Sequence, residues 1–251
     1  IALGFETPAT LTTATSSAVA SIDSFDAYVF QGDGAQPQDD ANKRAAFAGL
    51  YDDARGAGST IDFVASTGLA ALSSSEAIQQ VVGSYTPAVA YPGDPFSQSL
   101  LEVAQLVGAG LGTDVFYTSV GSFDTHANQA QEHATLLSWV SNGLAAFYQD
   151  MTAHGFGDRL LVMTFSEFGR RVNENESAGT DHGTAGPMLF LGNGVRGGVY
   201  GDHPSLEQLD ENYDLIHEID FRATYATVLR HWLGTDPEPI LGGQFEDLGF
   251  L

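Results

Sequence analysis

Hydrophobic residues recur at helical spacing in five segments of the chain. Side chains three or four positions apart lie on one face of a helix, so an apolar stripe at that interval predicts a helix that packs on a core. Residues with this pattern are 39–56, 59–82, 97–106, 127–153 and 219–233. The stretch between the second and third segments contains several prolines and glycines, which predicts a loop.

Three further apolar runs have the composition of buried strands. They cover residues 114–120, 160–165 and 188–191 and are rich in β-branched, aromatic and aliphatic side chains. Strands that alternate with helices are typical of an α/β fold with a mainly parallel sheet flanked by helices. We expect residues 1–36 to be irregular chain with one or two short strands. Because no repeat or linker interrupts the sequence, it predicts a single α/β domain over residues 1–251.

Charge and composition exclude several classes of protein. The chain carries 32 acidic and 9 basic residues, a formal net charge of −23 at pH 7. A nucleic-acid-binding protein needs a basic patch, so we expect no nucleic-acid partner, and repulsion disfavours docking on anionic lipid. No apolar run reaches the roughly 18 residues of a membrane span. The sequence has no cysteine, which excludes disulfides, thiolate nucleophiles and cysteine zinc sites.

Polar clusters accompany all three predicted strands. Residues 121–126 (Gly-Ser-Phe-Asp-Thr-His) follow the first strand, and residues 166–171 (Ser-Glu-Phe-Gly-Arg-Arg) follow the second. Residues 179–183 (Gly-Thr-Asp-His-Gly) precede the third. In an open parallel sheet the carboxyl ends of the strands form one rim, and ligands bind there. The placement therefore predicts that the three clusters converge on one pocket.

Two of these clusters contain candidate metal ligands. Asp124, His126, Asp181 and His182 offer oxygen and nitrogen donors that suit Zn, Mn or similar divalent ions. In an extended chain, residues two apart point the same way, as Asp124 and His126 would. Glycines on both sides of the Asp-His pair would let that loop turn toward a shared centre. His203, in a Gly-Asp-His-Pro stretch, is a candidate for a later ligand.

The 166–171 cluster supplies candidate catalytic groups. Glu167 could bind a metal, accept a hydrogen bond from a metal ligand or act as a general base. Arg170 and its neighbour Arg171 carry guanidinium forks that suit phosphate, sulfate or carboxylate. Ordinary structural roles stay open for every cluster. Asp124 could cap the helix that follows it, the Asp-His pair could be a surface turn, and Glu167 could pair with Arg170.

Taken together, the motifs resemble those of a large bacterial family, the domain-of-unknown-function family numbered 1501. The matching stretches are residues 121–126, 164–170, 179–183 and 220–222 with the helix after them. Members of that family look like distant relatives of the alkaline phosphatase and sulfatase superfamily. The resemblance implies an alkaline phosphatase-like fold. Since members typically carry a twin-arginine export leader, it also implies a periplasmic or exported location.

The resemblance further implies a divalent metal ion (Zn, Mn or Ca) as cofactor. Asp181 and His182 are similar to the adjacent pair that holds a metal in the superfamily, and His203 is the nearest match to a late ligand. Asp124 and His126 lie closer together than the corresponding superfamily ligands. The superfamily also uses an early strand with a metal-binding Asp and a nucleophile, which nothing here matches. The chain therefore resembles the C-terminal two-thirds of a longer protein, with the N-terminal part missing.

Two functions follow as hypotheses. The first is a metal-dependent hydrolase of phosphate or sulfate esters, in which Glu167 and Arg170 are the catalytic groups and the substrate is an anionic small-molecule ester. Because no nucleophile is matched, we expect this chain alone to be inactive. The second is a non-catalytic exported scaffold or binding domain that recognises a partner or a glycan.

Overall fold

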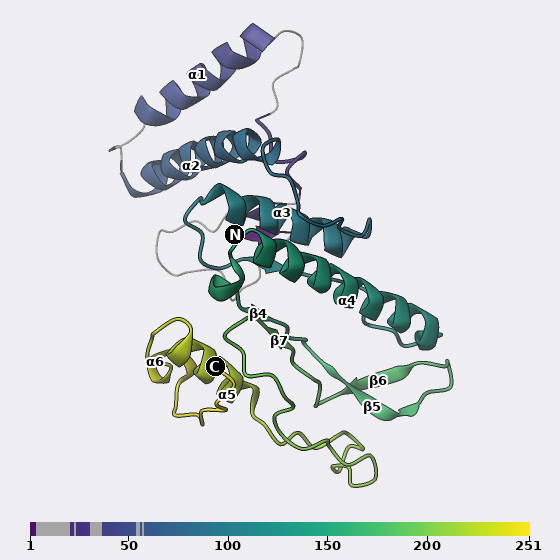
Figure 1. Ribbon diagram of the computed structural model, residues 1–251. Coiled ribbons are helices and arrows are strands. Elements are labelled where there is room, and N and C mark those ends of the chain that lie inside the picture. Colours follow the sequence, from purple (N-terminus) through teal and green to yellow (C-terminus); the bar gives the residue numbers. More distant parts are fainter. Residues whose placement is uncertain (4–20, 23, 31–36, 54–55, 57) are drawn as a thin grey trace. The chain divides into compact units, whose positions relative to one another are not determined.

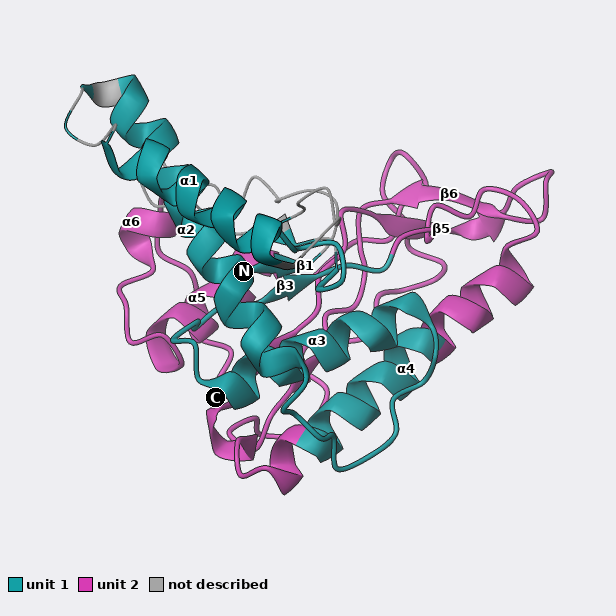
Figure 2. Ribbon diagram, turned by 90° about the horizontal axis from the view of Figure 1, so that it is seen from above, with its two compact units in different colours: residues 1–120, 139–150 teal, residues 121–138, 151–251 magenta. Residues whose placement is uncertain are grey.

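The computed structural model describes residues 1–3, 21–22, 24–30, 37–53, 56 and 58–251 (Figure 1). The chain divides into two compact units (Figure 2). Unit 1 contains residues 1–120 and 139–150, and unit 2 contains residues 121–138 and 151–251. The single domain expected over the whole chain stays a prediction.

The helices of unit 1 follow the hydrophobic periodicity of the sequence. They are α1 (Pro37–Asp53), α2 (Ser59–Val82) and α3 (Pro95–Ala109), together with the middle of α4 (Gln129–Ala153). Helix α1 packs on α2, and α2 packs on α3. The helices predicted in this part of the sequence are confirmed, with shifts of a few residues at their ends.

Local sequence fixes both ends of α3. The side chain of Asp94 accepts a hydrogen bond from the backbone N–H of Ser97 at 2.9 Å, which satisfies a donor of the first turn. Pro95 occupies the first helical position, where its missing N–H costs nothing. The helix ends at Gly110, whose φ of 66° is left-handed and favours glycine.

The sheet of unit 1 consists of three short parallel strands in the order β2–β1–β3. These are β1 (Ala2–Leu3), β2 (Ser21–Ile22) and β3 (Tyr117–Thr118). Both residues of β1 are buried, so the sheet contributes to the core of the unit. The strand predicted over 114–120 is confirmed at its centre. Strands β1 and β2 are the short strands expected within residues 1–36, part of which lies outside the described residues.

A buried carboxylate fastens the loop before α3 to α4. Asp150 is fully buried and accepts hydrogen bonds from the hydroxyls of Tyr85 at 2.7 Å and Tyr91 at 2.9 Å, and from the backbone N–H of Ala88 at 2.7 Å. Burial, and then the Asp150 carboxylate, raise the pKa of both tyrosines well above the usual range. Both hydroxyls therefore stay protonated and keep donating to the carboxylate.

Unit 2 contains two small antiparallel sheets. Strand β4 (Val162–Met163) pairs with β7 (Phe190–Leu191), and β5 (Gly169–Glu174) pairs with β6 (Thr180–Gly183). Strands β4 and β7 lie inside two of the predicted strands. The expectation of a mainly parallel sheet is wrong for the described part of unit 2. Strand direction is set by hydrogen bonds between distant segments, and a local apolar run carries no information about it.

The β5–β6 hairpin forms where the sequence predicts a loop. Asn175 closes its turn, because the backbone N–H of Asn175 donates to the carbonyl of Gly179 at 2.8 Å. The side-chain oxygen of Asn175 accepts from the N–H groups of Ser177 at 2.9 Å and Gly179 at 3.1 Å. The strands are polar, so they lack the apolar alternation that would have revealed them. These hydrogen bonds stabilise the turn, and they leave no hydrophobic pattern in the sequence.

The last predicted helix is confirmed as α5 (Phe221–His231), and a short helix α6 (Glu238–Leu241) follows it. Asp220 caps α5 by accepting a hydrogen bond from the backbone N–H of Arg222 at 2.9 Å. The guanidinium of Arg222, which also hydrogen-bonds to this carboxylate, is the main cause that lowers the pKa of Asp220 to about 2. The capping carboxylate of Asp220 therefore contacts both the backbone N–H and the positive charge of Arg222.

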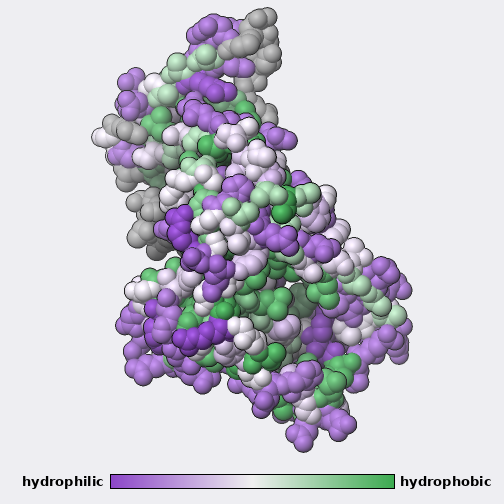
Figure 3. Space-filling view, viewed as in Figure 1, coloured by the Kyte–Doolittle hydropathy of each residue, from purple (hydrophilic) through white to green (hydrophobic). Residues whose placement is uncertain are grey.

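The surface drawn in Figure 3 mixes hydrophilic and hydrophobic residues without a clear separation. Single apolar side chains are strongly exposed, as at Val199, which is 94% accessible. Such isolated exposure is ordinary in folded proteins. None of the helices in the described ranges has the length and apolarity needed to cross a membrane.

Candidate metal centre

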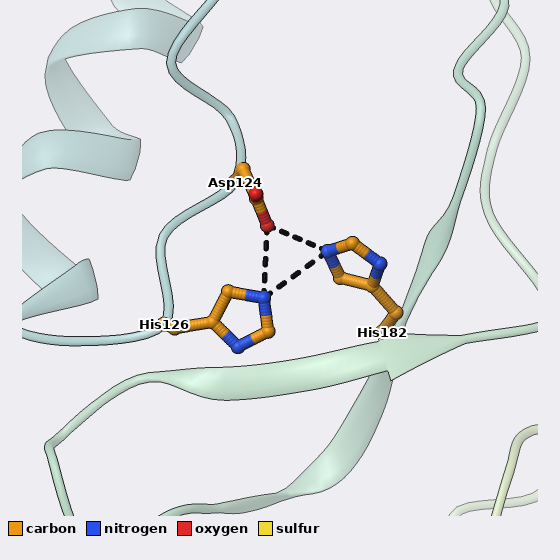
Figure 4. A group of neighbouring side chains, drawn as sticks. All are labelled: Asp124, His126 and His182. Carbon is orange, nitrogen blue, oxygen red and sulfur yellow. Dashed lines mark hydrogen bonds and ion pairs between the residues drawn. The ribbon is translucent and has the colours of Figure 1, made fainter.

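Three predicted site residues meet at one point in unit 2 (Figure 4). Asp124 and His126 lie on the loop that leads into α4, and His182 lies on β6. The Oδ1 atom of Asp124 is 2.6 Å from Nε2 of His182 and 2.9 Å from Nε2 of His126. The two Nε2 atoms are 3.2 Å apart. One carboxylate oxygen and two imidazole nitrogens therefore converge on a common centre, which we call the Asp-His-His cluster.

The donor set of the Asp-His-His cluster fits a transition-metal ion. Carboxylate oxygen and imidazole nitrogen bind Zn and Mn, whereas Ca prefers oxygen ligands alone. The ligand atoms of a tetrahedral zinc site with bonds of about 2.1 Å lie roughly 3.4 Å apart. The longest separation in the cluster, 3.2 Å, is close to that value. The three side chains are 62%, 48% and 45% exposed, so an ion and a further ligand can reach them from solvent.

Asp181 lies beside the cluster. Its Oδ1 atom is 3.5 Å from Nδ1 of His126, while Nε2 of the same ring faces Asp124. With a metal ion at Nε2, Nδ1 of His126 would face the Asp181 carboxylate. This is the chain of carboxylate, histidine and metal in which the outer carboxylate orients the ring.

An aromatic ring holds His182 in place. The ring of Phe168 stacks on the imidazole of His182 with centroids 3.9 Å apart and planes inclined by 4°. The β5–β6 register also places Arg170 opposite His182 on the neighbouring strand. Stacking on one side and strand pairing along the backbone restrict the rotamers of His182, so its Nε2 atom stays directed at Asp124.

Backbone and side-chain hydrogen bonds attach the ligand loop to the hairpin. The N–H groups of Asn128 and Gln129 donate to the carbonyls of Ser177 and Ala178 at 3.0 Å and 2.9 Å. The side-chain nitrogen of Asn175 donates to the carbonyl of His126 at 3.0 Å. These bonds join two segments about 50 positions apart in sequence, and they bring Asp124 and His126 to His182.

Gly179 allows the loop and the hairpin to approach each other. A Cβ atom at this position would lie 2.2 Å from the carbonyl carbon of His126 and 2.6 Å from the backbone nitrogen of Ala127. Real Cβ atoms do not come that close to backbone atoms, so any side chain here would push the two segments apart. The glycine is needed for close packing against the ligand loop.

Arg170 lies next to the cluster with its guanidinium turned toward the backbone. It donates hydrogen bonds to the carbonyls of Phe123 and Thr180. Its Nη2 atom is 4.0 Å from Oδ1 of Asp124, and its side chain is 20% exposed. The structure therefore brings Arg170 to the Asp-His-His cluster, with two of its N–H groups bonded to main-chain oxygens.

A comparison with known protein families gives a match for this chain. The profile of a family described as "Protein of unknown function (DUF1501)" matches residues 30–246. The chain belongs to this family. The match covers every residue of the Asp-His-His cluster, and it confirms the family resemblance drawn from the motifs. No curated protein and no solved structure matches this DUF1501 chain.

Hydrogen bonding controls the charge of Asp124 in the DUF1501 chain. The pKa of Asp124 is lowered, first by the hydrogen bond from His182 and then by the neighbouring charges of His126 and His182. The lowered pKa extends the ionised form of the carboxylate, which is the form that binds a metal ion, to lower pH.

Four of the predicted site residues lie outside the Asp-His-His cluster, and of these Asp181 and Arg170 lie beside it. Glu167 is exposed on the segment before β5. His203 is exposed, and its Nδ1–H group donates to the carbonyl of the adjacent Pro204 at 2.8 Å. The cluster found among the described residues consists of Asp124, His126 and His182 alone.

Sequence reasoning missed the residues that support the cluster. Asn175 stands in an Asn-Glu-Ser sequon, which draws attention to glycosylation, yet its side-chain nitrogen is occupied by the His126 carbonyl. Phe168 lies within the quoted Ser-Glu-Phe-Gly-Arg motif, but a single aromatic residue gave no signal for stacking. In both cases the partner is far away in sequence, so only the folded chain reveals the contact.

Proposed function

We propose that this DUF1501 chain forms the metal centre of a hydrolase that cleaves phosphate or sulfate esters, with Asp124, His126 and His182 holding one divalent ion. The observation that carries the proposal is the convergence of one carboxylate oxygen and two imidazole nitrogens within 3.2 Å of each other. Three protein ligands leave room for water or substrate, as catalytic rather than structural sites do. The donor types favour Zn or Mn over Ca.

A bound ion would polarise the ester oxygen and stabilise the negative charge that develops on it. The protein's own residues prepare that site. The carboxylate of Asp181, 3.5 Å from Nδ1 of His126, would favour the tautomer with its proton on Nδ1, which leaves Nε2 free to bind the ion. Phe168 holds the ring of His182. Glu167, exposed on the segment before β5, is the candidate general base for an attacking water.

The fold and the location that the family resemblance implies are also part of this proposal. An alkaline phosphatase-like arrangement is supported by the Asp-Thr-His and Asp-His motifs, of which Asp124, His126 and His182 lie around one centre. An exported location is proposed from the export leader that the resemblance implies for members of this family. Both are proposed on that likeness, and function on a shared fold always depends on the site itself.

A second candidate function is a non-catalytic exported binding domain. The observation in its favour is that the cluster already satisfies its own hydrogen bonds, since Asp124 accepts from both histidines. Such a cluster can fasten the loop to the hairpin without an ion. In that case the exposed surface around it would contact a partner or a glycan.

Metal binding separates the two functions. The longest available form of the protein is stripped with chelator and titrated with Zn²⁺ and Mn²⁺ by calorimetry, followed by a screen of phosphate and sulfate monoesters and diesters. We expect one ion per chain, and about 10–100-fold weaker binding in Asp124→Asn and His182→Gln. His203→Gln, an exposed histidine outside the cluster, should bind like wild type. Absence of binding, or equal binding in all variants, would favour the binding domain.

A further inference from the structure

The guanidinium of Arg170 bridges the two segments that carry the metal ligands. Its Nη2 group donates to the carbonyl of Phe123, the residue before Asp124. Its Nη1 group donates to the carbonyl of Thr180 on β6, the strand that carries His182. A single side chain therefore joins the loop to the strand from within β5. Charged donors make stronger hydrogen bonds than neutral ones, so this link is well suited to fix a distance.

The same contacts leave Arg170 poorly suited to hold a substrate anion. Arginine grips an oxyanion with two N–H groups along one edge of its plane, and both edges that can do so include Nη2. Nη2 carries one N–H group on each of these edges, and in this protein it donates to the carbonyl of Phe123 and, at 3.5 Å, to the hydroxyl of Thr125. The guanidinium also lies over the ring of Phe168 at 5.0 Å. A bidentate contact with phosphate would break the bonds that hold the loop.

We infer that Arg170 is a positioning residue of the metal centre, which sets the separation of Asp124 from His182 and does not bind the substrate anion. The inference rests on the proposed function, because it concerns the same metal site. The Nη2 atom stands 4.0 Å from Oδ1 of Asp124, beyond hydrogen-bond distance. That oxygen consequently stays directed at the two histidines while the guanidinium holds the backbone on either side.

The test compares Arg170→Lys and Arg170→Gln with wild type. Lysine keeps the charge but cannot donate to two carbonyls in a planar fork, and glutamine keeps a donor without the charge. Arg171→Lys is the matched control, since Arg171 is on the same strand and pairs with Asp214 at 3.0 Å, away from the cluster. Three quantities are measured: Co²⁺ affinity with its visible absorption spectrum, inorganic phosphate affinity of the Co²⁺-loaded protein, and amide hydrogen exchange of Asn128 and Gln129 without metal.

A positioning role predicts that both Arg170 variants bind Co²⁺ about 10–100-fold more weakly, with an altered spectrum. The amides of Asn128 and Gln129 should lose protection in the metal-free variants, because they donate to the hairpin. Wild-type Co²⁺ affinity combined with lost phosphate affinity would overturn the inference and make Arg170 an anion ligand. If wild type binds no Co²⁺, the proposed function fails. Amide exchange in the metal-free proteins then decides the positioning role, and unchanged protection in both variants would refute it.

Discussion

Gly179 lies against the backbone of His126 so closely that a Cβ atom there would stand 2.2 Å from the His126 carbonyl carbon. A glycine in the turn of the hairpin therefore controls how near the loop with the candidate metal ligands can come to it. The relationship links a backbone requirement to the chemistry of the site, because His126 can reach His182 only while the two segments remain in contact.

Replacing Gly179 with alanine should separate the loop from the hairpin. We expect a loss of stability of about 1–3 kcal/mol from the steric overlap and metal binding at least about 10-fold weaker. Gly121→Ala is the control, since no atom lies within 4 Å of a Cβ at that position in the same loop. Calorimetric titration with Zn²⁺ and urea unfolding measure both effects. Unchanged Zn²⁺ affinity in Gly179→Ala would show that the contact does not control the cluster.

Removing the ring of Phe168 should allow the side chain of His182 to adopt other rotamers. We expect Phe168→Ala to weaken Zn²⁺ binding about 10-fold, because the stacked ring no longer restricts the imidazole. Phe168→Tyr keeps the aromatic face and should bind like wild type. Competition with a chromophoric chelator provides the affinities. Equal affinities in all three proteins would exclude an orienting role for the stack.

The buried carboxylate of unit 1 should be important for stability. Asp150→Ala would leave the hydroxyls of Tyr85 and Tyr91 and the N–H of Ala88 without their acceptor. We expect a loss of about 3–5 kcal/mol, as is usual when one partner of a buried charged network is removed. Tyr91→Phe removes a single bond and should cost about 1 kcal/mol. Urea unfolding measures both losses of stability. A smaller loss for Asp150→Ala than for Tyr91→Phe would contradict this order.

The cap of α5 should give a defined pH dependence. The pKa of Asp220 is lowered to about 2 in the folded protein, so its carboxylate contributes stability above its ordinary pKa near 4. That contribution is lost as the pH falls from 4 toward 2. Asp220→Asn keeps a capping oxygen but loses the charge. We expect it to be less stable by about 0.5 kcal/mol at pH 6, a small value because the pair is exposed.

Thermal unfolding between pH 2 and pH 6 measures this difference. The gap between wild type and Asp220→Asn should narrow as the pH approaches 2, where protonation of Asp220 begins to remove its charge. A gap that stays constant over this range would mean that the charge of Asp220 does not stabilise the helix.

The sequence by itself determined the helices and the candidate ligands that the fold brings together. Helical periodicity is a local property, and apolar residues at that spacing must bury one face, so α1 to α5 were predictable. The side chains of Asp124, His126 and His182 were selected for their donor chemistry alone, and that chemistry does not depend on the fold.

Only the tertiary structure decided how those residues are assembled. The antiparallel pairing of β5 with β6, the stacking of Phe168 and the bonds of Asn175 and Arg170 all join residues through contacts that no local pattern records. Polar strands have no hydrophobic alternation to reveal them, and an arginine beside acidic residues looks the same in sequence whether it holds an anion or a backbone. The packed loop and hairpin fix the direction of the Arg170 N–H groups. For this reason the sequence identified the candidate ligands, and the fold decided which residues support them.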